Sequence, residues 1–335
     1  MTTTTESAAD AAPAPAGASP PTSGAKGREP RSLGVQNLAG WLFSTPFLVL
    51  FSVFMAFPIV ATLAMSFTDF GLRNVTDPLS AEFIGFENYT KLFGDEKFLK
   101  ALFNTAYFVV VGVPLTIGAG LAAAVLLNSG IDRARTLFRV GFYAPVVTSI
   151  VAVAVVWTFV LDPSEGLIAG LASEVGLTTP DFLGSEALAM PSLILMAVWR
   201  NLGTVMVLFI AGLQAIPADV REAARLDGAG RRHLLRHVIL PAVTPVIVFL
   251  LLWQTINALQ VFDLVYVTTK GGPLGSTTVI VYFIWEQAFK NFTAGYGAAA
   301  AYALALALLL IAAVPRVARG VRSRRENHRL EGAAR

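Results

Sequence analysis

Long apolar stretches alternate with shorter polar connections along most of the chain. Six of these stretches reach the roughly 20 residues that a helix needs to cross the hydrocarbon core of a bilayer. Their approximate bounds are 38–67, 102–127, 142–161, 187–215, 242–265 and 295–315. Prolines within or near the spans are tolerated in a membrane, because neighbouring helices satisfy the carbonyl groups that they free. The pattern predicts an all-α polytopic membrane protein with six transmembrane helices.

A weaker apolar run at 277–292 carries Glu286 and Lys290. Two charged side chains are costly inside hydrocarbon. We therefore expect this run to be a helix packed at the outer face of the membrane, not a seventh span.

Residues 1–37 precede the first span as a tail, and residues 1–32 are of low complexity, rich in Thr, Ala, Pro and Gly. This segment has too little apolar surface to offset its ordering entropy, so it is predicted to be disordered. A signal peptide is the competing interpretation, because basic residues precede an apolar run. The run is too long for one, however, and no small-residue cleavage site follows a short apolar core.

Lysine and arginine cluster in the N-terminal tail, in the second and fourth connections and in the C-terminal tail at 316–335. The remaining connections carry few of them. Because basic residues concentrate on the cytoplasmic side, this distribution predicts that both termini are cytoplasmic.

Composition supports the membrane assignment. Hydrophobic residues make up 55% of the 335 residues and charged residues 14%, with a mean hydropathy of +0.64. Soluble domains carry about 25% charged residues. The chain has no cysteine, which excludes disulfides, a thiol nucleophile and a Cys-ligated metal site.

The connection at 216–241 has the pattern of a short helix followed by a turn. Pro217 suits a first helical turn, and Asp219 complements the positive end of the helix dipole. Gly228 can adopt the left-handed conformation that ends a helix. Such a helix can dock into a groove on a partner. The pattern alone leaves equally open an amphipathic connector that lies on lipid.

A longer motif runs through this connection. Glu222, Ala223 and Ala224 are followed after three residues by Gly228, and after nine more by Val238-Ile239-Leu240-Pro241. This spacing resembles the EAA loop of ABC importer permeases, with Val238 in place of the family's usual Ile. The resemblance implies that Glu222, Ala223, Ala224 and Gly228 belong to a coupling helix seated in a cleft on a cytoplasmic ATPase subunit.

Two further segments narrow the resemblance. Residues 83–89, with Gly85, Asn88 and Tyr89, resemble the GxxNY segment of sugar-importer permeases, and residues 262–273 resemble the Gly-Gly-Pro loop of the maltose and glycerol-phosphate type, the first permease of its pair. The resemblance covers 38–315. It implies a type I permease fold in the cytoplasmic membrane of a prokaryote and transport of a sugar or sugar derivative by alternating access.

The resemblance also implies the partners: a second permease subunit, an ATPase dimer and an extracytoplasmic solute-binding protein. ATP and Mg are then expected on the ATPase, with no cofactor on this chain. We expect no nucleic acid to bind.

Polar side chains inside spans are expensive, so each is a candidate site residue. In the resembling family, sugar hydroxyls are bound by polar groups on the spans that flank the coupling loop. The matching positions here are Arg200, Asn201, Thr204, Gln254 and Asn257. Arg200, near mid-bilayer, must face a water-filled cavity or pair with a carboxylate such as Asp263. Hydrogen bonding between neighbouring helices is the alternative role for the others.

Other chemistry finds little support. Gly118-Ala119-Gly120 lacks the following Gly-Lys-Ser/Thr of a phosphate loop. His233 and His237 lack a third metal ligand nearby, and no nucleophile is paired with a base. We therefore expect a transport subunit and no catalytic or metal site. An ion-coupled secondary transporter is the alternative, but it would show inverted repeats and would leave the coupling motif unexplained.

Overall fold

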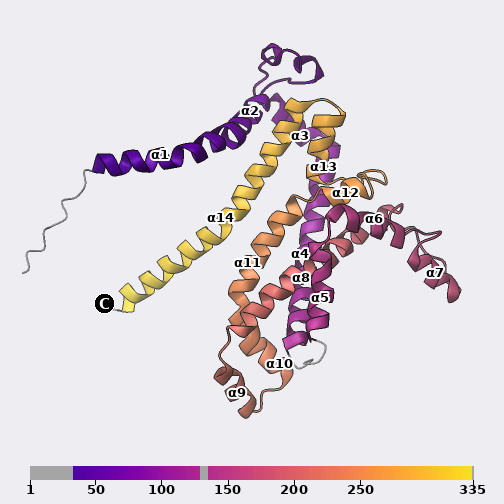
Figure 1. Ribbon diagram of the computed structural model, residues 1–335, viewed down its shortest axis with the longest axis vertical. Coiled ribbons are helices and arrows are strands. Elements are labelled where there is room, and N and C mark those ends of the chain that lie inside the picture. Colours follow the sequence, from indigo (N-terminus) through magenta and orange to yellow (C-terminus); the bar gives the residue numbers. More distant parts are fainter. Residues whose placement is uncertain (1–32, 129–134, 334–335) are drawn as a thin grey trace, which may run out of the picture. The chain divides into compact units, whose positions relative to one another are not determined.

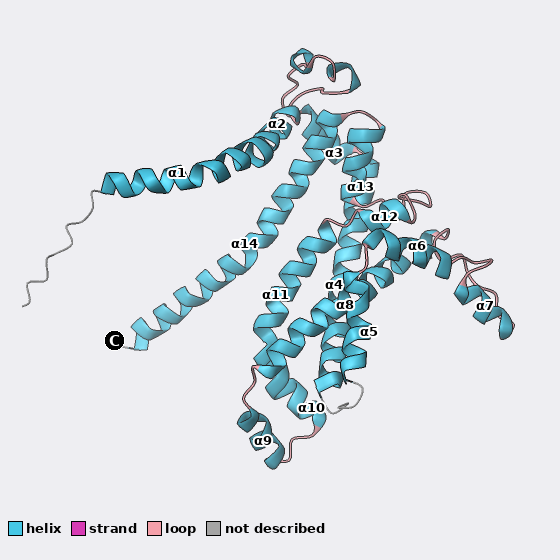
Figure 2. Ribbon diagram, viewed as in Figure 1, coloured by secondary structure: helices cyan, strands magenta, loops and turns pink. Residues whose placement is uncertain are grey.

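The computed structural model describes residues 33–128 and 135–333, which are helical or loop without a strand (Figure 2). The chain divides into two compact units, 1–57 and 58–335. The predicted disorder of residues 1–32 falls outside the described part. The absence of strands agrees with the predicted all-α class.

The described part of the first unit is a single apolar helical segment. It comprises α1 (Leu33–Phe51), the π-helical turn η1 (Ser52–Ala56) and the first residue of α2 (Phe57–Met65). Large side chains such as Trp41, Phe43 and Phe54 are well exposed. A helix that is apolar on every side is typical of a membrane span, and residues Gly40–Met65 are long and apolar enough to cross a bilayer.

Three long helices form the centre of the second unit: α4 (Glu96–Asn128), α8 (Glu186–Gln214) and α11 (Leu240–Leu259). α8 packs along α4 on one side and against α5 (Arg135–Val147) on another (Figure 1). Their shared core buries large apolar side chains, among them Val113, Ile117, Met206, Phe209 and Leu250.

Small residues let these helices approach closely. A Cβ on Gly120 of α4 would overlap the side chain of Val205 on α8, and a Cβ on Gly212 of α8 would stand 2.9 Å from Val246 Cγ2 on α11. Close backbone contact at small residues is how helices associate in lipid, where no hydrophobic force joins them.

The third predicted span, 142–161, is not one straight helix. It consists of α5 and α6 (Ile150–Val160), which meet at an angle of 104°. α5 ends two residues after Pro145, which cannot donate a backbone hydrogen bond, and Ser149 then adopts an extended ψ of 135°. Among the residues that the structure describes, five helices are therefore individually long and apolar enough to cross a membrane, or six when the bent pair counts as one span.

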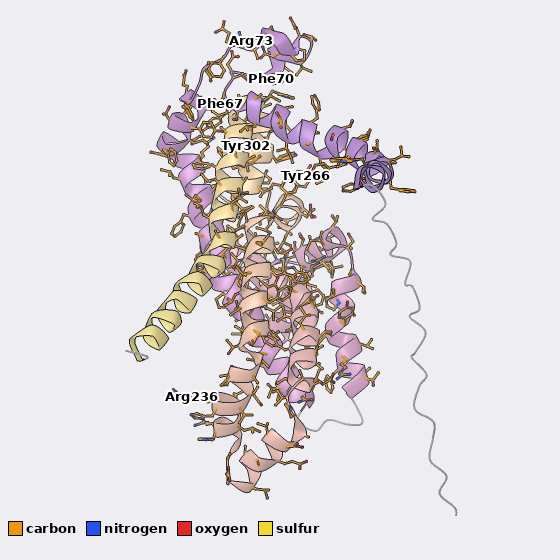
Figure 3. All side chains as sticks on the ribbon, turned by 90° about the vertical axis from the view of Figure 1, so that its left-hand side faces the viewer. Phe67, Phe70, Arg73, Arg236, Tyr266 and Tyr302 are labelled. Atoms are coloured by element: carbon orange, nitrogen blue, oxygen red, sulfur yellow. The ribbon has the colours of Figure 1, made fainter. Side chains whose placement is uncertain are left out.

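Short elements cap the two ends of this bundle. At one end lie α9 (Ala218–Leu226), α10 (Arg231–Leu234) and the π-helical turn η4 (Leu235–Ile239); at the other lie the 3-10 turns η2 (Leu72–Asn74) and η3 (Pro78–Ser80) with α3 (Glu87–Gly94). Figure 3 shows Arg236 and Arg73 at these opposite ends.

The remaining helices complete the second unit. α7 (Leu167–Glu174) follows α6, and α12 (Asp263–Val267) follows α11. The weak apolar run forms only α13 (Ile280–Trp285) and the π-helical turn η5 (Glu286–Lys290), too short to cross a bilayer. α14 (Ala294–Ala333) is apolar over Ala294–Ala313 and stays helical into the basic C-terminal sequence.

Candidate functional site

A polar cavity of about 220 Å³ lies among α4, α8, α11 and the segment that leads into α12. Four of the five predicted site residues line it: Arg200 and Asn201 from α8, Gln254 and Asn257 from α11. Gln260 and Asp263 extend the polar lining at the end of α11. Arg200 lies 14 residues before the end of α8, and Gln254 lies 14 residues after the start of α11. The cavity is therefore roughly 20 Å of helix away from the end of the bundle that carries α9.

The amide side chains in this cavity do not bridge neighbouring helices. Asn201 Nδ2 donates to Ala197 O at 2.8 Å, and Asn257 Nδ2 donates to Trp253 O at 2.9 Å, each within its own helix. Their side-chain oxygens therefore remain able to accept hydrogen bonds. Gln254 is buried, yet within the described residues its amide makes no hydrogen bond. Asn201, Gln254 and Asn257 thus leave donor and acceptor capacity facing the cavity.

Arg200 lies near the middle of α8 and lines the cavity, which is one of the two surroundings that the sequence left open for it. Its Nε is buried without a hydrogen-bond partner in the described structure. Asp263 lines the same cavity, but in the described part of the chain the two side chains form no ion pair. A buried, unsatisfied guanidinium nitrogen is costly, so this position favours a partner that enters the cavity.

The set of residues that line the cavity differs from the predicted set at two places. Thr204 lies one turn beyond Arg200 on α8 and does not line the cavity. Gly112 and Thr116 of α4 do line it and were missed. The sequence pattern could have indicated them, because a Gly and a polar residue four apart share one face of an otherwise apolar helix.

An aromatic cluster borders the cavity on the side away from α9. Phe262 lines the cavity and stacks on Tyr266, with ring centroids 5.2 Å apart. Trp285 meets Tyr266 edge to face at 4.9 Å. Tyr266 is well exposed, and Figure 3 marks its position. The cavity is therefore lined by polar side chains on α8 and α11 and by the ring of Phe262, and the rest of the aromatic cluster packs behind that ring.

The predicted coupling motif forms a helix that stands clear of the bundle. Ile216 is buried in the core and fixes the point where α9 leaves α8. Along α9, Glu222 and Ala223 are exposed, Ala224 is half-buried and Leu226 is 89% exposed. Leu226 thus adds an apolar side chain to the exposed surface of α9.

Gly228 ends α9 in the left-handed conformation that the sequence predicted, with φ of 76°. The backbone N–H of Ala229 donates to Ala224 O at 3.0 Å, which closes the six-residue turn of a Schellman motif. The turn directs the chain into α10. The ring of His233 on α10 stacks on the ring of His237 on η4, with centroids 4.1 Å apart. Among the described residues, no three His, Asp or Glu side chains are grouped to hold a metal ion.

The comparisons with known proteins agree with this arrangement. Residues 112–325 match the family model for the binding-protein-dependent transport system inner membrane component. The chain is 36% identical to the probable ABC transporter permease protein YesP of Bacillus subtilis over 289 residues, covering 85% of this chain and 91% of that one. It is 32% identical to the trehalose/maltose transport system permease protein MalF of Thermococcus litoralis, covering 81% and 90%.

The fold is similar to that of a chain in a crystal structure of a bacterial alginate ABC transporter, solved in complex with a periplasmic protein that holds an alginate pentasaccharide. The TM-score is 0.71 at 23% sequence identity, over 83% of this chain and 92% of that one. This likeness confirms the type I importer permease fold.

A bundle of membrane-spanning helices with a polar cavity at its centre and an exposed helix at one end defines a transport subunit. The chain belongs to the family of binding-protein-dependent transport system inner membrane components and is an ABC transporter permease. It is accordingly a multi-pass inner-membrane protein, and the family assignment favours the ABC permease over the ion-coupled secondary transporter.

Proposed function

We propose that the chain forms one half of the translocation pathway of an ATP-driven importer for a sugar or sugar derivative. The observation that carries this proposal is the cavity lined by Arg200, Asn201, Gln254 and Asn257. Amide and guanidinium groups with free hydrogen-bonding capacity suit the hydroxyl groups of a carbohydrate. The trehalose/maltose permease among the relatives supports the same substrate class.

The orientation follows from the distribution of charge. Arg232 and Arg236 lie at the end of the bundle that carries α9, and the C-terminal sequence is basic. By the positive-inside rule this end faces the cytoplasm, together with both termini. The loops around Arg73 and α3 then face outward.

The family to which the chain belongs supports a specific set of partners. α9 docks into a groove on a cytoplasmic ATPase dimer, which binds ATP and Mg; a second permease completes the pathway, and an extracytoplasmic solute-binding protein delivers the solute at the outer face. Glu222, Ala223, Ala224 and Gly228 are the coupling residues. The exposure of α9 along most of its length supports this role, because a docking helix must offer its surface to the partner.

The connections of α9 support a path by which its motion would reach the cavity. α9 follows α8 directly through the buried Ile216, and α10 leads through η4 into α11. These same two helices carry Arg200, Asn201, Gln254 and Asn257. A displacement of α9 by the closing ATPase dimer therefore acts on both walls of the cavity. Packed helices respond to such a push as rigid bodies, which yields alternating access.

The test is to purify the chain with the second permease and the ATPase encoded in its genomic neighbourhood, comparing wild type with Gly228→Ala and Gly230→Ala. A Cβ meets open space at both positions, but only Gly228 has a positive φ. A left-handed non-glycine residue costs roughly 1–2 kcal/mol. Gly228→Ala should thus disturb the turn, while Gly230→Ala serves as the matched control.

We expect the wild type and Gly230→Ala to retain the ATPase and to hydrolyse ATP faster when solute-loaded binding protein is added. Gly228→Ala should lose much of that stimulation. If the wild type never retains an ATPase, the importer proposal is wrong. Equal stimulation in all three proteins would instead remove Gly228 from the coupling mechanism.

A further inference from the structure

A second cavity of about 320 Å³ lies at the end of the bundle opposite α9. It is formed by the start of α4, the loop at 270–278 and α13 with η5. Three lysines line it: Lys97 and Lys100 from α4, and Lys270 from the loop. The proposed translocation cavity shares none of these residues.

The loop that carries Lys270 is held in a fixed shape. Thr277 Oγ1 donates to Gly272 O at 2.7 Å, and Thr278 Oγ1 donates to Gly271 O at 3.1 Å. A Cβ at Gly271, where φ is 81°, would stand 2.7 Å from Thr278 Oγ1, so the turn accommodates only glycine there. The backbone next to Lys270 is therefore held in one conformation.

Two side chains of α4 donate hydrogen bonds to the same loop. Asn104 Nδ2 donates to Gly275 O and to Thr278 O, both at 2.9 Å, and Asn104 is buried. Lys100 Nζ donates to Leu274 O at 2.7 Å. Leu274 itself is 81% exposed. An exposed leucine at the tip of an anchored loop offers an apolar contact beside the lysines.

The positive charge of this cavity is not neutralised by the residues that the structure describes. Glu286 is its one acidic lining residue among those described, and Glu286 Oε1 already pairs with Lys290 Nζ at 2.7 Å. Within the described residues, none of the three lysines forms an ion pair. The side chains of Lys97, Lys100 and Lys270 are exposed. Their charges are thus available to a partner of opposite sign.

We propose that Lys97, Lys270 and the tip of the loop at Leu274 form a docking surface for carboxylates on the solute-binding protein. Lys100 keeps the loop in place through its bond to Leu274 and adds to the positive potential. This inference rests on the proposed function, which places this end of the bundle outside the cell. Complementary charge mainly accelerates association and sets orientation, which suits a partner that must dock and leave in each cycle.

The experiment measures ATP hydrolysis by the full complex in vesicles as solute-loaded binding protein is titrated. The test variant is Lys97→Glu/Lys270→Glu, which leaves Lys100 and the loop anchors intact. The matched control is Arg73→Glu, an exposed basic residue at the same end of the bundle that does not line the cavity. Hydrolysis without binding protein reports assembly and folding of each complex.

We expect the double variant to raise the concentration of binding protein that gives half-maximal stimulation by roughly tenfold, with basal hydrolysis unchanged. In the wild type that concentration should rise with salt, because screening shortens the reach of exposed charges from about 10 Å at 0.1 M to about 3 Å at 1 M. Arg73→Glu should behave as wild type.

Equal half-maximal concentrations in wild type and double variant would overturn the proposal. So would a defect that disappears when anionic lipid is left out of the vesicles, since the lysines would then bind headgroups. A wild-type complex that binding protein never stimulates would contradict the proposed function itself. If the wild type is stimulated and the double variant matches it, only the docking proposal is wrong. The two failures can therefore be told apart.

Discussion

Gly203 on α8 lies directly against the backbone of Phe142 on α5. A Cβ on Gly203 would overlap the carbonyl oxygen of Phe142 and stand 2.9 Å from Tyr143 Cα. Backbone atoms cannot move aside as a side chain can. This contact fixes α5, and with it the bend toward α6, against the helix that carries Arg200 and Asn201.

Gly203→Ala should therefore destabilise the protein by about 1–3 kcal/mol through overpacking. The measurement is the midpoint of thermal unfolding in detergent. Gly118→Ala on α4 is the control, because a Cβ there meets no atom within 4 Å. If both variants unfold at the wild-type temperature, α5 and α8 are not in close contact in the protein.

Gln254→Leu should weaken solute-dependent stimulation of ATP hydrolysis. The substitution keeps the volume and removes a buried amide that lines the cavity. Loss of one hydrogen bond to solute costs about 0.5–1.5 kcal/mol, or roughly two- to tenfold in apparent affinity. The assay follows ATP turnover against the concentration of solute supplied with the binding protein.

Thr204→Val provides the comparison for that prediction, since Thr204 lies one turn from Arg200 but outside the cavity. Its apparent affinity should equal that of the wild type. A loss at Thr204 as large as the loss at Gln254 would show that the solute follows a different path through the bundle.

Asn104→Asp should loosen the loop at 270–278 while leaving the long helices unchanged. The carboxylate lacks the donor that serves Gly275 O and Thr278 O, and an unsatisfied buried group costs about 1–3 kcal/mol. Hydrogen–deuterium exchange of the peptide covering 271–279 should accelerate, whereas exchange in α8 should match wild type. Unchanged exchange in the loop would mean that other contacts suffice to hold it.

Asp162 should make the loop after α6 sensitive to acid. Its Oδ1 accepts backbone N–H groups of Glu165 at 2.9 Å and Ser164 at 2.8 Å, and these bonds lower the pKa of the carboxyl below its usual 3.8. Because the pKa is depressed in the folded state, the stabilisation is present above pH 3.8 and is lost as pH falls through the lower value.

Carboxyl ¹³C shifts of labelled aspartate, assigned by difference against Asp162→Asn, would follow this titration. A resonance that titrates below pH 3.8 is expected for Asp162. A titration midpoint at or above pH 3.8 would show that the two backbone hydrogen bonds are absent in solution.

The sequence predicted the class of fold because hydrophobic length is a local property. The stretch at 187–215 became α8 to within one residue at each end, and the stretch at 102–127 lies within α4, which begins at Glu96. The bend between α5 and α6 could not be predicted in the same way. Pro145 marks a weak point, but prolines at 46 and 114 lie inside continuous helices, and tertiary packing decides which one breaks.

In the candidate site, too, local features could be predicted from the sequence and contacts between helices could not. Arg200 and Gln254 were found because a polar side chain in an apolar span is conspicuous. Thr204 was included and Thr116 missed because helical spacing says which residues share a face, not which neighbour that face meets. The lysine cavity joins residues about 170 positions apart, Lys100 and Leu274, and no local pattern predicts such a pair.

The exposure of Leu226 has a consequence for the life of the protein in the cell. In the proposed assembly α9 faces the cytoplasm, so a chain synthesised without its ATPase would carry an uncovered leucine on a short helix there. Chaperones and proteases bind such apolar segments, so an orphan copy would be open to removal. In the proposed assembly the ATPase covers the segment, so removal of orphan copies helps to match the amounts of the subunits.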